Sequence, residues 1–194
     1  MRLRICLLLV VSFFLFTNAG LCQEKLIFGF EEDVPSWEIP DWCFEKEEYV
    51  AESMAISNKF AKEGNASLEL MANFPGKKWT ATYAEVQQFF DWTLYKTISA
   101  DIYLPVDAPF GLRARFILTV GEDWKWIEMA RLAKLVPGEW TTISADLRPG
   151  STDWRRTEVT DEFRSDVRKL GMRLESDMKP VYSGPIYIDN VRLD

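Results

Sequence analysis

Apolar and polar residues alternate along much of the chain, as they do in strands that bury one face. In residues 97–106 ("TISADIYLPV") every even position is apolar, and the odd positions are mostly polar. In residues 112–120 ("LRARFILTV") the even positions are again apolar, whereas Arg113 and Arg115 occupy odd positions. We therefore expect the even residues of both segments in the core and the odd residues on the opposite face of a sheet.

About nine short strands follow from this pattern, with Gly, Pro, Asn and Asp between them. Their regular spacing predicts an all-β fold, an antiparallel β-sandwich of the jelly-roll type. One short helix is expected over residues 160–169, where Thr160 can cap it and Phe163 and Val167 can face the sandwich. The strands are expected within residues 25–30, 65–72, 81–90, 97–106, 112–120, 124–133, 139–147, 170–176 and 185–193.

The strand after residues 112–120 brings an aromatic and an acidic residue to the face that carries the two arginines. If this strand is antiparallel, Trp126 and Glu128 lie beside Arg113 and Arg115. The same alternation is expected to add residues from other strands, namely Asp101, Tyr103, Arg173 and Glu175. Arginines donate hydrogen bonds, carboxylates accept them and an indole can stack on a sugar ring, so this mixture suits a glycan. The alternative is that these charges only pair with one another on a solvated face.

The remaining tryptophans divide by context. Trp124 sits two residues before Trp126 but nearer the turn, so we expect one platform residue and one rim or structural residue rather than two buried indoles. Trp37 and Trp140 are expected in the core. Trp79 and Trp154 stand in polar, loop-rich segments, where they either wall a groove or cover an edge of the sandwich.

The N-terminus has the pattern of an export signal. Arg2 and Arg4 precede an apolar run that ends in small residues, and that run is too short to span a membrane. We expect residues 1–22 to be removed and residues 23–194 to form one domain, secreted or periplasmic. Lipid anchoring through Cys22 is the less favoured alternative, because Leu21 before it is not a small residue.

Composition excludes several function classes. The 194 residues carry a formal net charge of −7, which becomes −9 without residues 1–22, and this argues against nucleic acid or an anionic membrane as partner. There is no histidine, which removes Ser–His and Cys–His catalysis and the usual zinc ligand sets. Cys43 is the only cysteine after residue 22, so no internal disulfide is expected in the mature chain.

Segments near both ends resemble one protein family. "IFGFEEDVPSW" (27–37), "EGNASLEL" (63–70), "VPGEWTTISADL" (136–147) and "SGPIYIDNVRLD" (183–194) occur in an order that is similar to the jelly-roll carbohydrate-binding modules of the galactose-binding-like superfamily. The resemblance implies a structural Ca²⁺ held by Glu31 and Asp189, with backbone carbonyls around Lys62 and Gly64. The alternative is that Glu31 is a surface acid and Asp189 bonds nearby amides.

The resemblance and the residues together predict noncatalytic binding of a polysaccharide or oligosaccharide, with a glycoside hydrolase or another exported protein as a further partner. An exported structural or protein-interaction sandwich is the alternative. A glycoside hydrolase is less favoured, because no compact acid cluster is present. The expected ligand-binding residues are Trp79, Tyr103, Arg113, Arg115, Trp124, Trp126, Glu128, Trp154 and Arg173.

Overall fold

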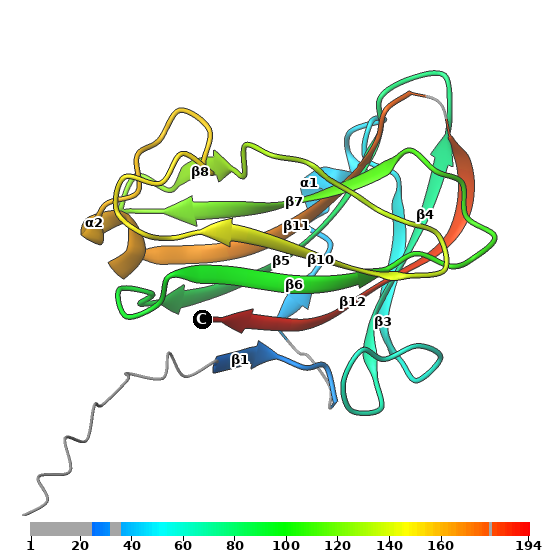
Figure 1. Ribbon diagram of the computed structural model, residues 1–194. Helices are drawn as coiled ribbons and strands as arrows, with labels where there is room; N and C mark the ends of the chain where they lie inside the picture. The colour runs from blue at the N-terminus through cyan, green and yellow to red at the C-terminus, as the bar shows by residue number, and fades with distance from the viewer. Residues whose placement is uncertain (1–24, 32–35, 179) are drawn as a thin grey trace, which may run out of the picture.

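Two antiparallel sheets face each other across an apolar core in the computed structural model, which describes residues 25–31, 36–178 and 180–194 (Figure 1). The predicted antiparallel sandwich is therefore confirmed. The expected export signal, with Cys22, lies outside the described residues. Among the helices of the described part, none has the length and apolar character needed to cross a membrane.

The first sheet, here called sheet A, contains β1 (Lys25–Phe28), β3 (Ala51–Ser57), β4 (Ser67–Pro75), β6 (Thr97–Tyr103), β10 (Trp140–Asp146) and β12 (Val181–Leu193). Its order is β10-β6-β12-β4-β3, and β1 also pairs with β12. Lys25 of β1 lies opposite Leu193 at the end of β12. The start of the described chain and its C-terminus therefore lie side by side on one edge of sheet A (Figure 1).

The second sheet, sheet B, contains β2 (Trp37–Glu38), β5 (Ala81–Phe90), β7 (Leu112–Val120), β8 (Lys125–Glu128), β9 (Ala133–Lys134) and β11 (Val167–Ser176). Its order is β2-β5-β11-β7-β8, with β9 paired to β7 beyond the end of β8. Two short helices complete the fold, α1 (Asp41–Phe44) and α2 (Asp161–Ser165).

The alternation in the sequence correctly identifies the buried faces of β6 and β7. The even residues of 98–104 and of 112–120 all belong to the apolar core between the sheets. Burial of this apolar surface is the main term that stabilises the sandwich. Because successive strand residues point to opposite faces, the odd residues of β7 are directed away from the core, onto the outer face of sheet B.

The helix prediction is correct in place but too long. α2 ends at Ser165, and Val167 instead begins β11. Thr160 caps α2 as expected, since its hydroxyl oxygen accepts a hydrogen bond from the amide of Phe163 at 3.2 Å. β2, β3 and α1 were not expected, because two of them are very short and β3 is an edge strand without clean alternation.

Candidate functional site

The outer face of sheet B gathers most of the residues that the sequence placed together. Arg115 of β7 lies opposite Arg173 of β11, and Arg113 lies opposite Glu175. On the other side of β7, Glu128 lies opposite Ile117, and Trp126 lies opposite Thr119. The expected common face for Arg113, Arg115, Trp126, Glu128, Arg173 and Glu175 is therefore confirmed.

Four of these side chains form one ion-pair network. Glu128 accepts hydrogen bonds from Arg115 at 3.0 Å and from Arg173 at 2.9 Å. Glu175 lies behind them and accepts from Arg115 at 3.3 Å and from Arg173 at 3.1 Å. Each arginine is thereby held between two carboxylates. Arg155, from the loop after β10, adds a third contact to Glu128 at 3.2 Å.

Electrostatics keep Glu128 and Arg173 ionised. Burial alone would raise the pKa of Glu128, but the hydrogen bond and charge of Arg173, with the charge of Arg115, hold it below its ordinary value. Burial would likewise lower the pKa of Arg173, but Glu128 raises it. Glu128 is therefore an acceptor, and a poor proton donor, at neutral pH.

An aromatic layer lies beside the ion pairs. Trp126 is 41% exposed, and its ring centroid lies 5.5 Å from that of Tyr83 and 6.2 Å from that of Trp42. The Tyr83 ring lies against Gly171 of β11, where a Cβ would overlap the phenol. Because residue 171 has no side chain, the Tyr83 ring can pack directly on the backbone of β11. Tyr83 in turn supports Trp126.

Helix α1 and the loop after it form one wall of this face. Cys43 is buried against Tyr83 and Ile117, and burial, with the charge of Glu85, raises the pKa of its thiol to about 12. Trp42 contacts Tyr49 edge to face at 4.8 Å between centroids. On the far side of Tyr49 lies Trp79, and the Arg173 guanidinium stands 5.8 Å from the Trp79 ring. Trp79 therefore borders the same face, as one of its two interpretations expected.

Two depressions meet at Trp126 and Glu128. One has a volume of about 440 Å³, and the other, of about 650 Å³, extends toward the loop at residues 155–157. Volumes of this size are typical of ligand sites. Besides the two shared residues, the smaller depression is lined by Trp42, Lys46, Tyr49 and Arg173, and the larger one by Lys125, Arg155, Arg156 and Thr157. We call the surface around both depressions the Trp126 face.

Trp124 lies apart from Trp126, in the turn that precedes β8. Its backbone has a positive φ of 53°, and its side chain is 42% exposed. The Arg168 guanidinium lies 5.4 Å from the Trp124 ring and 5.4 Å from the Phe89 ring. The two indoles of "WKW" therefore have different surroundings, and neither is buried.

The prediction that Asp101 and Tyr103 join this face is wrong. Both lie on β6, which belongs to sheet A, so they point away from the core on the outer face of that sheet, on the opposite side of the sandwich. There Tyr103 stacks against Phe60 with 4.4 Å between ring centroids, and it also contacts Trp140 at 5.4 Å. Alternation fixes the face of a strand but does not identify its sheet.

Two tryptophans are also placed differently from the prediction. Trp154 is only 3% exposed and belongs to the core, where its indole donates to the Asp146 carbonyl at 2.9 Å. It therefore does not wall the groove. Trp140 is half-buried on Tyr103 instead of lying in the core, whereas Trp37 is buried in the core as expected.

Several residues of the Trp126 face were missed. Tyr83 alternates with Glu85 and Gln87 in "ATYAEVQQFF", so strand periodicity could have placed it on the outer face. No periodic signal exists for the other missed residues. Trp42 lies in a four-residue helix, and Lys46, Arg155 and Arg156 lie in loops.

The expected metal ligands do converge. Asp189 accepts hydrogen bonds from the amides of Lys62 at 2.7 Å and Glu63 at 3.2 Å, and Glu31 accepts from the amide of Asn65 at 2.9 Å. Burial raises the pKa of Asp189, and the charge of Glu31 adds to the effect. Gly64 has a positive φ of 63°, and a side chain on it would overlap the Glu31 carboxylate.

This donor set is compatible with Ca²⁺. Two hard carboxylates approach one exposed turn whose carbonyls can add ligands, and a cation there would relieve the repulsion between them. The turn presents its amides to the carboxylates in this structure, as the alternative interpretation expected. Within the described ranges, no group of three or more His, Cys, Asp or Glu side chains is arranged to hold a metal, so carbonyl ligands would be required.

Several solved structures with a similar fold are carbohydrate-binding modules. CBM27-1 of Caldicellulosiruptor saccharolyticus, in complex with mannohexaose, is 20% identical, with a TM-score of 0.62 over 88% of this chain and 96% of that one. The non-crystalline-cellulose-specific module CBM28 is 17% identical, with a TM-score of 0.61 over 86% and 92% of the two chains. TmCBM27, described for specific mannan recognition, is 21% identical, with a TM-score of 0.54 over 88% and 97%. At these identities the likeness shows the fold.

A search of curated proteins found no match. A family model supplies the assignment, because the family described as "Mannanase, galactose-binding domain-like" matches residues 28–190, most of the chain. The resemblance predicted from the sequence motifs is thereby confirmed: this chain belongs to the mannanase galactose-binding-domain-like family.

Proposed function

We propose that this protein binds a glycan, without catalysis, through the Trp126 face. The observation that carries the proposal is the half-exposed indole of Trp126, which is supported by Tyr83 and stands where two depressions meet. The family and the mannohexaose complex of a structural neighbour support a sugar as the ligand.

The chemistry of the face suits a sugar ring. The C–H-rich face of a pyranose can stack on Trp126, and its hydroxyls need both donors and acceptors. Arg173 and Glu128 line the same depression and offer both. Their mutual ion pair fixes both side chains before the ligand arrives, which reduces the entropy lost on binding.

A glycosidase would need a different carboxylate. Its general acid must hold a proton near neutral pH, which requires a raised pKa. The pKa of Glu128 is lowered, and its partner in the network, Glu175, is buried behind two arginines. These properties support binding without hydrolysis.

The test is a titration of the mature protein with soluble glycans, followed by tryptophan fluorescence. The panel would begin with mannohexaose and cellohexaose. We expect a saturable change with one glycan class and an affinity at least tenfold weaker in Trp126→Ala. Trp140→Ala is the matched control, since it removes an indole from the outer face of sheet A. A folded protein that responds to no glycan would favour the protein-interaction alternative.

We also propose a structural Ca²⁺ at Glu31 and Asp189. Both carboxylates approach the turn at residues 62–66, and this turn joins the two chain ends to β4. Bound there, Ca²⁺ would supply positive charge to two carboxylates whose partners in this turn are backbone amides. The cation stabilises the folded state only, because the ligands come from distant segments.

Thermal unfolding tests this proposal. Ca²⁺ at about 100 times its Kd should add about 2.7 kcal/mol to the free energy of unfolding, and EDTA should remove that increment. Glu31→Gln should abolish the response to Ca²⁺. Glu52→Gln, an exposed acid on β3, is the control. Equal melting temperatures in Ca²⁺ and EDTA would contradict the proposal.

Export completes the proposed function. The pattern of residues 1–22 supports removal of a signal and a secreted or periplasmic product, with a glycoside hydrolase or another exported protein as a further partner. Mass spectrometry of the protein from an exporting host would give the N-terminus directly. Retention of residues 1–22, or a lipid on Cys22, would contradict this part.

A further inference from the structure

The Trp126 face is basic, although the protein is acidic. The whole chain has 23 Lys and Arg against 30 Asp and Glu. The two depressions reverse this balance, because five cationic side chains line them and Glu128 is the only acid among their described lining residues. The five cations are Lys46, Lys125, Arg155, Arg156 and Arg173.

The single acid cannot neutralise them. Glu128 already accepts from Arg115, Arg155 and Arg173, so its charge is shared among three guanidinium groups. Lys46, Lys125 and Arg156 are exposed, and no carboxylate of the described residues lies within 4 Å of any of them. The rim of the Trp126 face therefore carries three cations that form no contact ion pair with a described carboxylate.

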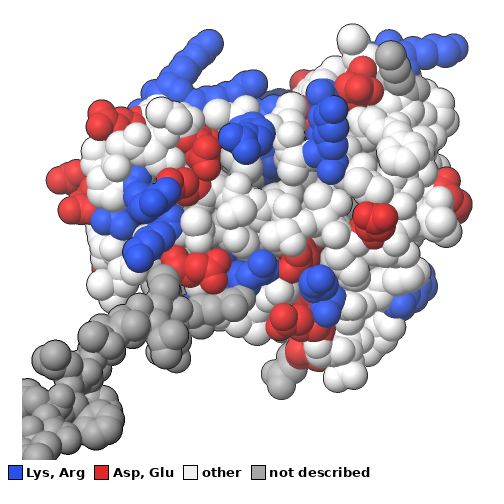
Figure 2. Space-filling model, in the orientation of Figure 1, with Lys and Arg blue, Asp and Glu red and all other residues white. Residues whose placement is uncertain are grey.

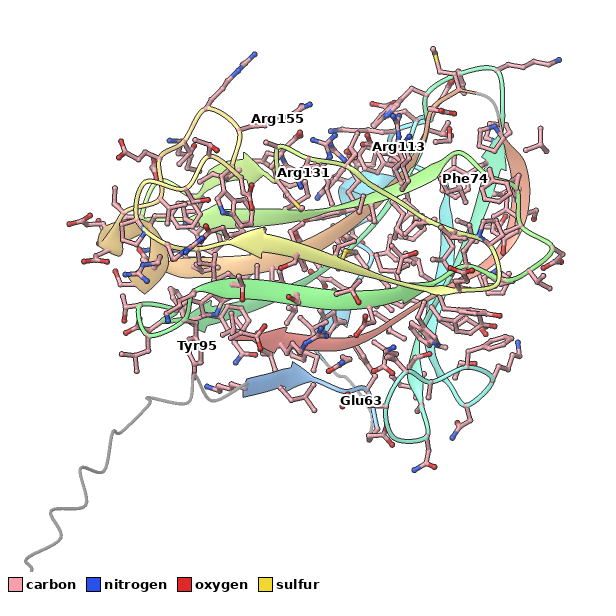
Figure 3. The ribbon with its side chains drawn as sticks, in the orientation of Figure 1. Glu63, Phe74, Tyr95, Arg113, Arg131 and Arg155 are labelled. Carbon is pink, nitrogen blue, oxygen red and sulfur yellow. The ribbon has the colours of Figure 1, made fainter. Side chains whose placement is uncertain are left out.

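The basic surface continues along the edge of sheet B. Arg113 of β7 lies directly opposite Lys134 of β9, a pairing of like charges that normally destabilises a sheet. The buried Nε of Arg113 also has no hydrogen-bond partner among the described residues. Figure 3 shows Arg113, Arg131 and Arg155 along the same upper side of the ribbon, and in Figure 2 basic side chains gather along this margin.

A neutral sugar does not explain this arrangement. Hydroxyl groups can be bound by neutral donors, and exposed like charges repel each other unless a ligand or salt compensates them. Arginine forks pair well with planar carboxylates and with sulfate-like oxygens. We therefore propose that the preferred ligand is an anionic polysaccharide, whose acidic groups contact the basic rim while one sugar ring stacks on Trp126.

This inference rests on the proposed glycan binding, and the test separates the two. The probes are β-1,4-linked mannohexaose and the β-1,4-linked hexamer of mannuronate, which differ only in oxidation at C6. A sulfated galactan oligosaccharide distinguishes sulfate from carboxylate as the anionic group. Binding is followed by titration calorimetry at 50 mM and 500 mM NaCl.

We expect at least one anionic probe to bind at least tenfold more tightly than mannohexaose at 50 mM NaCl, and to lose most of this advantage at 500 mM. The double variant Lys125→Ala/Arg156→Ala should remove most of the advantage, and it should weaken mannohexaose binding far less than it weakens anionic binding. Lys59→Ala/Lys96→Ala is the control, since it removes the same charge from exposed loop positions next to β3 and β6 of sheet A.

Each other outcome has a definite meaning. If mannohexaose binds through Trp126 as tightly as the anionic probes, the inference is wrong and the proposed function stands. If the control variant weakens anionic binding as much as the rim variant, the preference comes from overall charge and the rim assignment is wrong. If no probe binds to the folded protein, both proposals fail.

Discussion

Each outer face carries a carboxylate that accepts hydrogen bonds from several donors, but one carboxylate is buried and the other is partly exposed. On sheet A, Asp101 accepts from Thr142, from Asn190 at 2.9 Å and from Arg192 at 2.9 Å, and it is fully buried by these partners. On sheet B, Glu128 also collects several donors but remains partly exposed beside the indole of Trp126.

The position of each carboxylate in its sheet explains the difference. Asp101 lies on β6, between β10 and β12, so donors from both neighbouring strands close over it. Glu128 lies on β8, a four-residue strand at the edge of sheet B, so its outer side stays open. A carboxylate with several ion-pair partners in the middle of a sheet supports the fold, whereas such a carboxylate at a sheet edge can also contact a ligand.

The largest expected effect on stability comes from removing the buried carboxylate of Asp101. Asp101→Ala removes the buried carboxylate that accepts from Asn190 and Arg192, and we expect the free energy of unfolding to fall by about 3 kcal/mol. Glu128→Ala should cost about 1 kcal/mol, because water can replace part of its interactions. Urea unfolding measures both. Glycan titration should give the reverse ranking, and equal stability losses would break the contrast between the two faces.

A smaller effect on stability is expected from disturbing the packing of Tyr83 on Gly171. Gly171→Ala would push the phenol ring out of place, and overpacking of this kind costs about 1–3 kcal/mol. Trp126 should move with Tyr83, so its emission should shift and glycan affinity should fall severalfold. Gly184→Ala is the matched control, because a Cβ there would overlap Tyr182 on sheet A. It should lower stability without weakening glycan binding.

The smallest expected effect is that of pH. The lowered pKa of Glu128 means that its ionised form is favoured in the folded state, so its contribution is fully present above the unfolded pKa. That contribution should be lost as the pH falls below 4.5 and through the lowered value. Stability measured at pH 7 and pH 3.5 should differ less in Glu128→Gln than in wild type, by about 0.5 kcal/mol after solvent screening.

Without histidine, the Trp126 face contains no group that ordinarily titrates between pH 5 and 8. Glycan affinity should therefore be nearly constant across that range. A steep change near neutral pH would contradict the assignment of Glu128 and Arg173 as the polar contacts.

Sequence periodicity was sufficient to place one half of the Trp126 face. β7 and β8 are consecutive and antiparallel, so Arg113, Arg115, Trp126 and Glu128 could be placed together without knowledge of distant pairings. Arg173 followed from the clean alternation of β11.

The errors arose where the pairing or packing of distant segments determines where a residue lies. Tyr103 alternates as clearly as Arg115, but β6 pairs with β10 and β12 in the other sheet. Trp154 stands among polar residues, yet its loop folds back so that the indole enters the core. Trp42 reaches the Trp126 face from a single helical turn, which leaves no pattern in the sequence.

The pairing of β1 with the end of β12 has a practical consequence. Because Lys25 and Leu193 lie opposite each other, a tether attached at either end would leave the molecule from the same edge of sheet A. The Trp126 face belongs to the other sheet, and Figure 1 shows β8 and β1 on opposite sides of the molecule. The protein could thus be immobilised on a sensor, or fused to a reporter, through either end while its ligand-facing surface stays unobstructed.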